Sequence, residues 1–467
     1  MELIGRITKT PLLTHQKEAY ELGINLPSFA LFMEPGTGKT LPTIAVMGYR
    51  YFHNNARRAI VVCPLSVTYD WERQLREHAA FPYNIVELDK LGTSPHNCLE
   101  ITIINYEKLW EFSKKKNKRW EPSVRLMKYK ADIMVCDESH KIKNWNTHAT
   151  KAASRIGKGI PFKAILTGTP VTKYPLDLYS QINFLDSSIF NCTYKDFRKR
   201  YAVLDMWGRP RKYKDLDHLM NIVYKYAYRK LKKDIKEFPP PEVVRQNIYV
   251  TLEPRARKLY DKMAEKAIVQ IDGKFSTAPI PALVGMRCHQ IAGGYLTTEG
   301  DNSREVTRIS KAKLNALVEY VRDSEEKIVI FAQYIPEIHG IVDTLEEVGI
   351  ETLCITGATS KKIRGKIISQ FQSREEPRVI VIQISTGGVG ITLTAAHTMI
   401  FYSLGRSYTD HTQACDRINR IGQQSRLLKY IYLIAESTVD ELFWQSIIDK
   451  KNIADYTIDH LREVLAG

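Results

Sequence analysis

A short apolar run, a glycine-containing loop and a helix follow one another near the N-terminus, and few folds accommodate this succession. Phe29–Met33 is typical of a buried strand, and Lys39 and Thr40 begin a predicted helix. The loop between them consists of Pro35, Gly36, Thr37 and Gly38, after Glu34. Backbone N–H groups in such a loop surround phosphate oxygens, the lysine reaches the β- and γ-phosphates, and the threonine hydroxyl contacts Mg²⁺. The succession therefore predicts a nucleotide site.

Composition narrows the class of protein. The 467 residues are enough for two or three domains, and 44% apolar with 26% charged residues is ordinary for a soluble globular chain. Lys and Arg exceed Asp and Glu by 68 − 52 = 16. Such a surplus favours a polyanionic partner, nucleic acid before an acidic membrane surface.

Cysteine spacing and the N-terminus indicate the compartment. The 7 cysteines form no C-x-x-C pair, which argues against a zinc site and a disulfide framework and favours a reducing compartment. The sequence shows neither a signal-peptide apolar region nor a run long enough to span a membrane. We therefore expect an intracellular protein, cytoplasmic or nucleoid-associated, with no membrane partner.

A second apolar run ends in two adjacent carboxylates. Residues 131–136 are typical of a buried strand, and Asp137 and Glu138 follow it directly. In doubly wound sheets, ligands bind at this end of the strands. Asp137 can hold the Mg²⁺ that Thr40 also contacts, and Glu138 can orient or deprotonate an attacking water. Because the pair also follows the lysine-threonine loop at the spacing of one α/β lobe, it predicts nucleotide hydrolysis.

Strands alternate with helices in two separate parts of the chain. Residues 28–170 predict one α/β lobe with a largely parallel sheet, and residues 327–434 repeat the alternation without a second glycine-lysine-threonine loop. The proline run between the two parts is typical of a stiff linker. The expected domains are a nucleotide-binding first lobe at 1–175, its helical insertion at 176–237, the linker at 238–242, the start of the second lobe with a helical insertion at 243–305, and the rest of the second lobe with a C-terminal helix at 306–467.

Three further sequence features indicate a function only when they are considered together with the glycine loop at 35–38. Gln16, in a predicted amphipathic helix, can hydrogen-bond the adenine edge with its donor and its acceptor, and an exposed helix glutamine is the alternative. Arg417 and Arg420 are three residues apart, which predicts a shared helix face. A guanidinium delivered across a cleft can neutralise charge on a transferring γ-phosphoryl group, while an exposed basic helix is the alternative. The glycine-rich run that ends at Gly390 can bring backbone close to a phosphate.

Two segments of the first insertion interleave aromatic and basic residues. Residues 196–201 and 224–233 both predict helices. Such helices can follow a phosphate backbone, or they can bury the tyrosine rings and leave their basic ends in solvent. The sequence leaves both interpretations open.

In this order, the motifs resemble those of the Swi/Snf (Snf-two) ATPases of helicase superfamily two, which are double-stranded-DNA translocases with two RecA-like lobes. The resemblance covers about residues 10–455 and is most specific at Asp137–Asn144 and Arg417–Gln423. It implies an α/β fold with two RecA-like lobes, each a mostly parallel sheet with helices on both faces, plus helical insertions. It also implies ATP and Mg²⁺ as cofactors, duplex DNA as partner, and a compact member like those of bacteria or phages, monomeric in the absence of DNA. No recruiting protein partner is evident.

The resemblance also implies site residues. Those expected to act in hydrolysis are Lys39, Asp137, Glu138, His140, Arg417 and Arg420. Those expected to contact the nucleotide are Gln16, Pro35, Gly36, Thr37, Gly38, Lys39, Thr40 and Gly390, with Thr40 and Asp137 on the metal. Those expected to contact DNA are Ser66, Gln333, Thr356, Arg364, Ser385 and Thr386.

Two other functions compete with the translocase. A strand-separating helicase on DNA or RNA is compatible with the superfamily, and the sequence shows no wedge element that decides between them. A nucleic-acid-binding scaffold without ATPase activity is the third candidate, which the full set of expected hydrolysis residues disfavours.

Overall fold

The computed structural model describes most of the chain as two compact α/β units. The described residues are 2–95, 97–112, 120–171, 174–207, 210–235, 237, 241–271, 274–278, 281–299, 304–386, 391–405 and 408–449. Those up to 237 belong to the first unit and those from 241 onward to the second. The expected linker at 238–242 lies mostly outside the described residues, as does the lysine-rich segment at 113–119.

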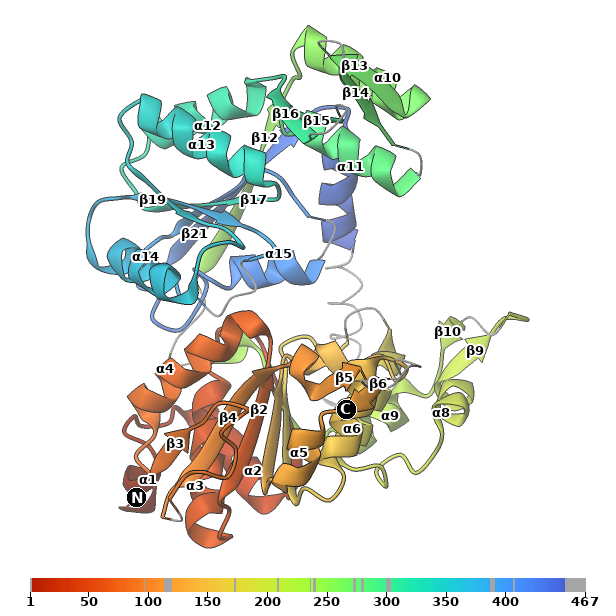
Figure 1. Cartoon of the computed structure of the whole chain (residues 1–467), viewed down its shortest axis with the longest axis vertical. Helices are drawn as coiled ribbons and strands as arrows, with labels where there is room; N and C mark the ends of the chain where they lie inside the picture. Colours follow the sequence, from red (N-terminus) through yellow and green to blue (C-terminus); the bar gives the residue numbers. More distant parts are fainter. Residues whose placement is uncertain are drawn as a thin grey trace. The chain divides into compact units, whose positions relative to one another are not determined.

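The first unit is built on a seven-stranded sheet in the order β11-β1-β8-β7-β2-β4-β3, with every neighbouring pair parallel (Figure 1). The strands are β1 (Ser28–Met33), β2 (Arg58–Cys63), β3 (Tyr83–Ile85), β4 (Leu99–Asn105), β7 (Ile133–Asp137), β8 (Phe162–Leu166) and β11 (Ala227–Lys230). Strands β1 and β7 are buried along their whole length, and β2 is buried after Arg58, because helices cover both faces of the sheet.

Two apolar layers cover the faces of this sheet. One layer contains α1 (Glu2–Ile7), α2 (Thr14–Asn25), α3 (Thr40–His53) and α4 (Thr68–His78). The other contains α5 (Val124–Tyr129), α6 (His148–Gly157), α7 (Leu178–Leu185), α8 (Tyr194–Tyr201) and α9 (Leu216–Val223). Two antiparallel hairpins complete the unit, β5 (Trp110–Phe112) with β6 (Trp120–Pro122), and β9 (Ala202–Leu204) with β10 (Pro210–Tyr213).

The helix expected over residues 224–233 is wrong. Helix α9 ends at Val223, and β11 instead lies parallel to β1, with Ala227 in register with Ala30. The exposed backbone edge of β1 requires hydrogen-bond partners, and this strand supplies them: the Ala30 N–H donates to the Tyr226 carbonyl. The helix expected over 196–201 is confirmed as α8, although the insertion as a whole is not purely helical.

The second unit is built on a six-stranded parallel sheet in the order β12-β21-β20-β17-β19-β18. Its strands are β12 (Glu242–Val250), β17 (Ile328–Ala332), β18 (Thr352–Ile355), β19 (Val379–Gln383), β20 (Thr398–Phe401) and β21 (Leu427–Ala435). One face is covered by α12 (Ala312–Arg322) and α13 (Ile335–Glu347), and the other by α14 (Lys361–Ser373), α15 (Tyr408–Cys415) and helical residues 439–449. The predicted pair of mostly parallel, helix-flanked sheets is confirmed.

The insertion between β12 and α12 contains a sheet that the sequence did not predict. Four antiparallel strands lie in the order β13 (Ile268–Ile271), β14 (Lys274–Thr277), β15 (Tyr295–Glu299) and β16 (Arg304–Arg308). They accompany α10 (Pro254–Lys266) and α11 (Pro281–Ala292). Helix α10 ends at Lys266, where Ala267 adopts a left-handed conformation with φ of 55°. None of the helices in the described ranges is long and apolar enough to cross a membrane.

Candidate active site

The carboxyl ends of three neighbouring strands bring the predicted hydrolysis residues of the first unit to one edge of its sheet. Strand β8 lies between β1 and β7, and Leu166 is in register with Leu31 on one side and Asp137 on the other. The loops that follow these three strands therefore start at the same level. The glycine loop follows β1 and the carboxylates end β7, as the sequence predicts.

The glycine loop has the backbone shape that a phosphate site requires. Gly36 and Gly38 have φ of 84° and 78°, a region that residues with a Cβ adopt only with strain. The Thr37 hydroxyl donates to the Glu34 carbonyl at 2.7 Å and is buried. Lys39 Nζ donates to the Met33 carbonyl at 2.9 Å, which holds the ammonium group over the start of the loop.

Helix α2 supports the loop from outside. His15 Nε2 lies 2.9 Å from the Thr37 carbonyl oxygen, and Gln16 Nε2 donates to the Gly38 carbonyl at 3.1 Å. The Gln16 carbonyl oxygen accepts from the Leu13 N–H at 3.0 Å. Gln16 is only 3% exposed, so the alternative of an exposed helix glutamine is wrong. The structure places Gln16 against the phosphate loop, and its contact with adenine stays a prediction.

The loop after β8 packs directly on the glycine loop. A Cβ at Gly168 would lie 2.2 Å from Cδ of Pro35 and 2.8 Å from its backbone nitrogen. Only glycine allows this approach without a backbone shift. The Gln181 side chain donates to the Pro170 carbonyl at 2.7 Å and accepts from the Ser139 hydroxyl at 2.7 Å. The loops after β1, β8 and β7 therefore form one connected support.

Asp137 is a buried carboxylate with both oxygens hydrogen-bonded. Trp71 Nε1 donates to Oδ2 at 2.9 Å, and the Glu138 N–H donates to Oδ1 at 2.9 Å. Burial, and then the negative charge of Glu138, raises the pKa of Asp137 to about 6, against the opposing effects of Lys39 and the Trp71 hydrogen bond. A buried carboxylate of raised pKa beside a lysine is stabilised by a second cation, which fits a Mg²⁺ ligand. No sequence pattern indicated this contact between Trp71 and Asp137.

Glu138 occupies a strained position next to His140. Its backbone adopts φ of 52° and ψ of 51°, a left-handed conformation that is unusual for a residue with a Cβ and recurs at functional sites. The Glu138 carboxylate lies 3.3 Å from His140 Nδ1, which also lies 3.5 Å from the Thr167 hydroxyl. The chain therefore turns sharply after β7, and His140 links the carboxylate to the loop after β8.

The two predicted arginines of the second unit do not share a helix face. Helix α15 ends at Cys415, before both arginines, and the Arg417 carbonyl accepts from the Leu393 N–H at 2.9 Å. Arg420 Nη1 donates to the Thr392 hydroxyl at 3.2 Å and to the Ile391 carbonyl at 3.4 Å. Both arginines are thus tied to residues 391–393, which follow the glycine run. Gly390 lies outside the described residues.

Three of the predicted DNA-contact residues gather at the carboxyl edge of the second sheet. Gln383 Oε1, at the end of β19, accepts from the Gly357 N–H at 3.0 Å and lies 3.4 Å from the Thr386 hydroxyl. Arg364 Nη2 donates to the Thr356 carbonyl at 3.5 Å. Gln383 organises this group, although the sequence gave no reason to select it. Ser385 lies beside Thr386, and Ser66 lies in the 3₁₀ turn Leu65–Val67 after β2 in the first unit.

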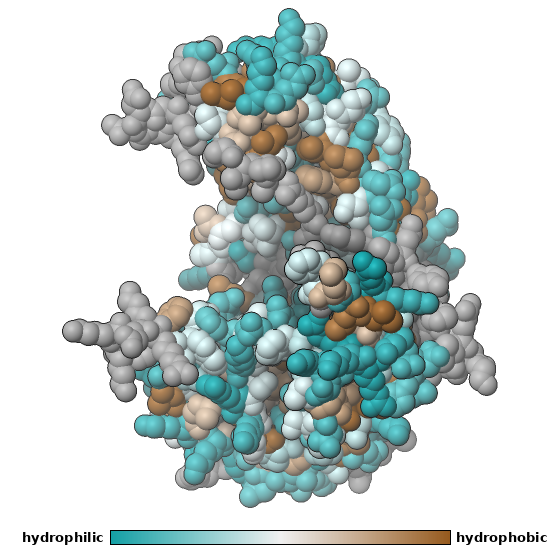
Figure 2. Space-filling view, turned by 90° about the vertical axis from the view of Figure 1, so that its right-hand side faces the viewer, coloured by the Kyte–Doolittle hydropathy of each residue, from teal (hydrophilic) through white to brown (hydrophobic). Residues whose placement is uncertain are grey.

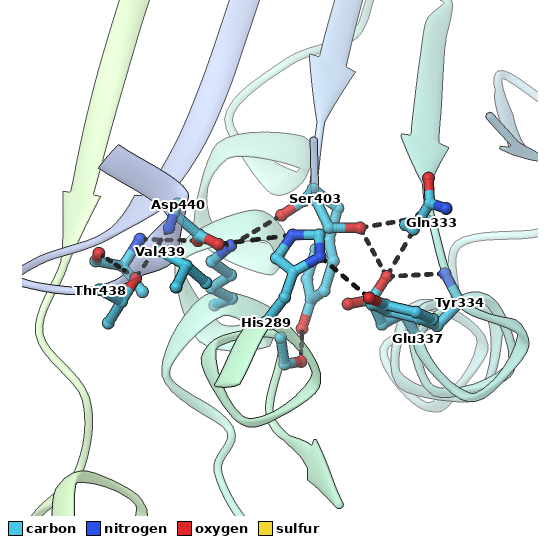
Figure 3. Close-up of polar contacts among 12 residues, drawn as sticks. His289, Gln333, Tyr334, Glu337, Ser403, Thr438, Val439 and Asp440 are labelled. Carbon is cyan, nitrogen blue, oxygen red and sulfur yellow. Dashed lines mark hydrogen bonds and ion pairs between the residues drawn. The ribbon is translucent and has the colours of Figure 1, made fainter. Parts of the chain in front are cut away.

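Gln333, the remaining predicted DNA contact, is held by the buried carboxylate of Glu337 (Figure 3). The Gln333 N–H donates to the Ser403 hydroxyl oxygen at 2.8 Å and to Glu337 Oε2 at 3.2 Å. The Ser403 hydroxyl and the Tyr334 N–H donate to the same Oε2 at 2.5 and 3.1 Å. Burial raises the pKa of Glu337 to about 7, although these hydrogen bonds oppose the shift.

A buried ion pair lies next to this carboxylate. Lys313 Nζ lies 2.5 Å from Asp440 Oδ2 and donates to the Tyr402 carbonyl at 3.0 Å. The His289 ring lies between the two groups in Figure 3, with Nε2 3.5 Å from Asp440 Oδ1 and Nδ1 3.1 Å from the Tyr334 hydroxyl. Residues from α11, α12, α13 and the helix at 439–449 therefore meet where β17 and β20 end. Sequence patterns did not indicate this cluster.

Comparisons with known proteins agree on one family. The family described as SNF2-related domain matches residues 19–286, and the helicase conserved C-terminal domain matches residues 312–422. The chain is 29% identical over 440 residues to an uncharacterized ATP-dependent helicase of Mycoplasma pneumoniae, covering 91% of this chain and 40% of the relative. It is 27% identical to the mouse (Mus musculus) DNA annealing helicase and endonuclease ZRANB3, covering 98% of this chain and 42% of the relative.

The chain thus spans about two-fifths of the length of these curated relatives, at 40% and 42%. Among solved structures, it is similar to the Sulfolobus solfataricus SWI2/SNF2 ATPase core in complex with dsDNA. That similarity has 25% sequence identity and a TM-score of 0.45, with coverage of 98% of this chain and 97% of the other.

Proposed function

The chain belongs to the family of SNF2-related domains, and on that premise we propose that it is an ATP-hydrolysing motor that moves along double-stranded DNA. The observation that carries the proposal is the meeting of Lys39, Asp137 and Glu138 at one edge of the first sheet. A phosphate loop beside a buried carboxylate and a strained glutamate is an arrangement for phosphoryl transfer to water. A scaffold without ATPase activity would not need it.

Each residue of this edge has a proposed role in hydrolysis. Backbone N–H groups of Pro35–Gly38 (proline's nitrogen excepted) surround the phosphates, and Lys39 pairs with the β- and γ-phosphates. Thr40 and Asp137 would hold Mg²⁺, which neutralises charge on the β- and γ-phosphate oxygens. Glu138 orients and deprotonates the attacking water, and its contact with His140 at 3.3 Å restricts where that carboxylate points. Gln16 and Gly390 are further proposed nucleotide contacts.

Arg417 and Arg420 are proposed to supply positive charge to the γ-phosphoryl group from the second unit. The hydrogen bonds of the Arg420 side chain with Thr392 and Ile391 support this role for Arg420, because a guanidinium that is anchored by its own chain loses little freedom when it binds an anion. In this proposal the two units close on ATP because both bind its γ-phosphate. Hydrolysis would remove that group, so the units would open again and the protein would advance along DNA.

Duplex DNA is the proposed track. The formal charge of +16 supports a polyanionic partner, and the mouse relative is named a DNA annealing helicase. Proposed contacts are Ser66, Gln333, Thr356, Arg364, Ser385 and Thr386. Contacts of this kind with the phosphate backbone read no sequence, so affinity should fall steeply with salt. We also propose that the protein acts inside the cell and is monomeric in the absence of DNA, which light scattering would test.

The proposed function is tested by comparing ATPase stimulation by duplex DNA, single-stranded DNA and RNA. Displacement of a third strand from a triplex and unwinding of a plain duplex are measured in parallel. The translocase predicts stimulation by duplex DNA and triplex displacement without efficient unwinding. Stimulation by RNA alone, or efficient unwinding of a plain duplex, would replace it with a strand-separating helicase.

A further inference from the structure

The β9–β10 hairpin carries the most exposed large apolar side chains among the described residues. Met206 is 90% exposed and Trp207 is 78% exposed, and both lie in the turn between the strands. In Figure 1 the hairpin projects from the first unit beside α8. Two neighbouring apolar side chains at the end of a projecting ribbon are unlike the single apolar residues that are scattered over an ordinary surface.

The base of the hairpin is firmly anchored. Ala202 pairs with Tyr213 and Val203 with Lys212, and the Lys214 N–H donates to the Tyr201 carbonyl at 3.0 Å. Tyr201 is buried against the core residue Phe197, with ring centroids 4.7 Å apart. The two strands of the hairpin are therefore attached to the core of the first unit through Tyr201.

The base of the hairpin also contacts the connection between β8 and α7. The Tyr213 ring centroid lies 6.1 Å from that of Tyr174, which directly precedes the turn leading into α7. The same stretch of chain begins after β8 with Gly168, which packs on Pro35 of the glycine loop. The hairpin is therefore joined through Tyr174 to the connection between β8 and α7, whose first residues pack on the glycine loop.

Charge around the tip favours a polyanion. The described residues of 199–214 include five basic side chains, Lys199, Arg200, Arg211, Lys212 and Lys214, and one acidic side chain, Asp205. All five basic residues are exposed. Figure 2 looks onto this side of the protein, where the described surface is largely hydrophilic and interrupted by hydrophobic areas. An apolar partner surface would not explain the surrounding cations, whereas nucleic acid offers phosphates and apolar base faces together.

We propose that the β9–β10 hairpin is a second nucleic-acid contact, in which Trp207 and Met206 stack on base faces at a junction between duplex and single-stranded DNA. Arg211, Lys212 and Lys214 contact the flanking phosphates. A two-stranded ribbon fits the major groove of a duplex, but an intact duplex presents only base edges there. Base faces are accessible where pairing ends or where a step is unstacked. The tip therefore distinguishes a junction from continuous duplex, whereas the DNA contacts named under the proposed function do not.

The test measures binding of the full chain to a forked duplex and to relaxed, closed circular duplex DNA, which has no ends. Trp207→Ala should weaken binding to the fork by about 5- to 150-fold, the range expected from loss of one base–aromatic stack. Binding to the closed circle should be unchanged within about twofold. Trp207→Phe should retain most of the fork affinity, because phenylalanine also stacks.

Two further measurements separate stacking from other effects. A 2-aminopurine placed at the junction should lose fluorescence on binding wild type but not Trp207→Ala. The matched control is Phe52→Ala, which removes a ring that is 45% exposed at the end of α3, far along the chain from the hairpin. It should leave binding to both DNAs unchanged. Equal weakening on both DNAs, or no change with Trp207→Ala, would overturn the proposal, as would a control that behaves like Trp207→Ala.

This inference rests on the proposed function in one respect, which is that the partner is DNA. If wild type shows no DNA-stimulated ATPase activity, the proposed function fails. If duplex DNA stimulates wild type and Trp207→Ala binds the fork normally, only the hairpin proposal fails.

Discussion

Trp71 donates its indole N–H to the buried carboxylate of Asp137 at 2.9 Å, across 66 residues of sequence. The contact joins α4 to the end of β7 and is one of two hydrogen bonds that fix the orientation of this carboxylate. A proposed metal ligand that is held in this way needs little reorganisation when it binds a cation.

Trp71→Phe should therefore destabilise the first unit through its effect on Asp137. A buried hydrogen bond to a charged group is worth about 1.5–3 kcal/mol, so the free energy of unfolding should fall by about 2 kcal/mol near pH 8. The loss should be smaller at about pH 5, where the carboxyl is protonated, because its pKa is about 6. Denaturant unfolding at the two pH values measures this. Trp110→Phe, at a half-buried ring, is the control, and an equal loss at both pH values would contradict the assignment.

Asp137→Asn should remove a pH-dependent loss of folding stability and should also abolish ATP hydrolysis. The pKa of Asp137 is raised from 3.8 to about 6, so the folded protein binds more protons than the unfolded chain between these values. The ionised carboxylate therefore destabilises the fold above pH 6, and wild type should lose about 1–2 kcal/mol relative to the variant between pH 5 and pH 8. Unfolding of both proteins without nucleotide tests the sign. A wild type that gains stability relative to the variant over this range would refute it.

Gly168→Ala should displace the glycine loop. The added Cβ would lie 2.2 Å from Pro35 Cδ, so the backbone must shift where the proposed phosphates bind. We expect affinity for an ATP analogue to fall about tenfold or more, which corresponds to about 1.4 kcal/mol. Isothermal titration calorimetry measures it. Gly5→Ala, at a glycine with no neighbour within 4 Å of an added Cβ, should leave the affinity unchanged.

Ser403→Ala should weaken DNA binding through Gln333. The Ser403 hydroxyl accepts from the Gln333 N–H and donates to Glu337, so its removal leaves the segment after β17 less constrained. The DNA concentration that gives half-maximal ATPase stimulation should rise about fivefold, as expected for about 1 kcal/mol, with the maximal rate little changed. Ser373→Ala, which removes an exposed hydroxyl at the end of α14, is the control. A fall in the maximal rate alone would assign Ser403 to chemistry instead.

Much of the sheet architecture could be predicted from the sequence, for a physical reason. Central parallel strands are buried on both faces and therefore appear as continuous apolar runs, as Ile133–Cys136 does before Asp137. Strand β11 lies at the sheet edge and carries Arg229 and Lys230, so no such run marks it. The antiparallel strands β13–β16 are also short, and the glycine and proline residues between them are typical of turns, so the sequence did not predict these strands.

Some residues of the candidate active site could likewise be predicted from the sequence, and others could not. Local sequence patterns identify four residues of the site, Lys39, Thr40, Asp137 and Glu138. Each of them directly follows, or ends, the glycine loop or the apolar strand by which it is recognised. Trp71, Gln181 and Gln383 act through contacts with residues distant in sequence, and no local pattern records them. The expected shared helix face of Arg417 and Arg420 was wrong, because α15 already ends at Cys415 and the Arg420 side chain instead bonds to Thr392 and Ile391.

Glu138→Gln in the triplex-displacement assay tests the central claim most directly. The variant keeps the shape of the side chain but removes the proposed base. Wild type with ATP should displace the third strand from duplex DNA, whereas Glu138→Gln should bind ATP with nearly unchanged affinity and displace none. Normal ATP turnover and displacement by Glu138→Gln would contradict the account, as would a wild type that hydrolyses ATP without displacing the third strand.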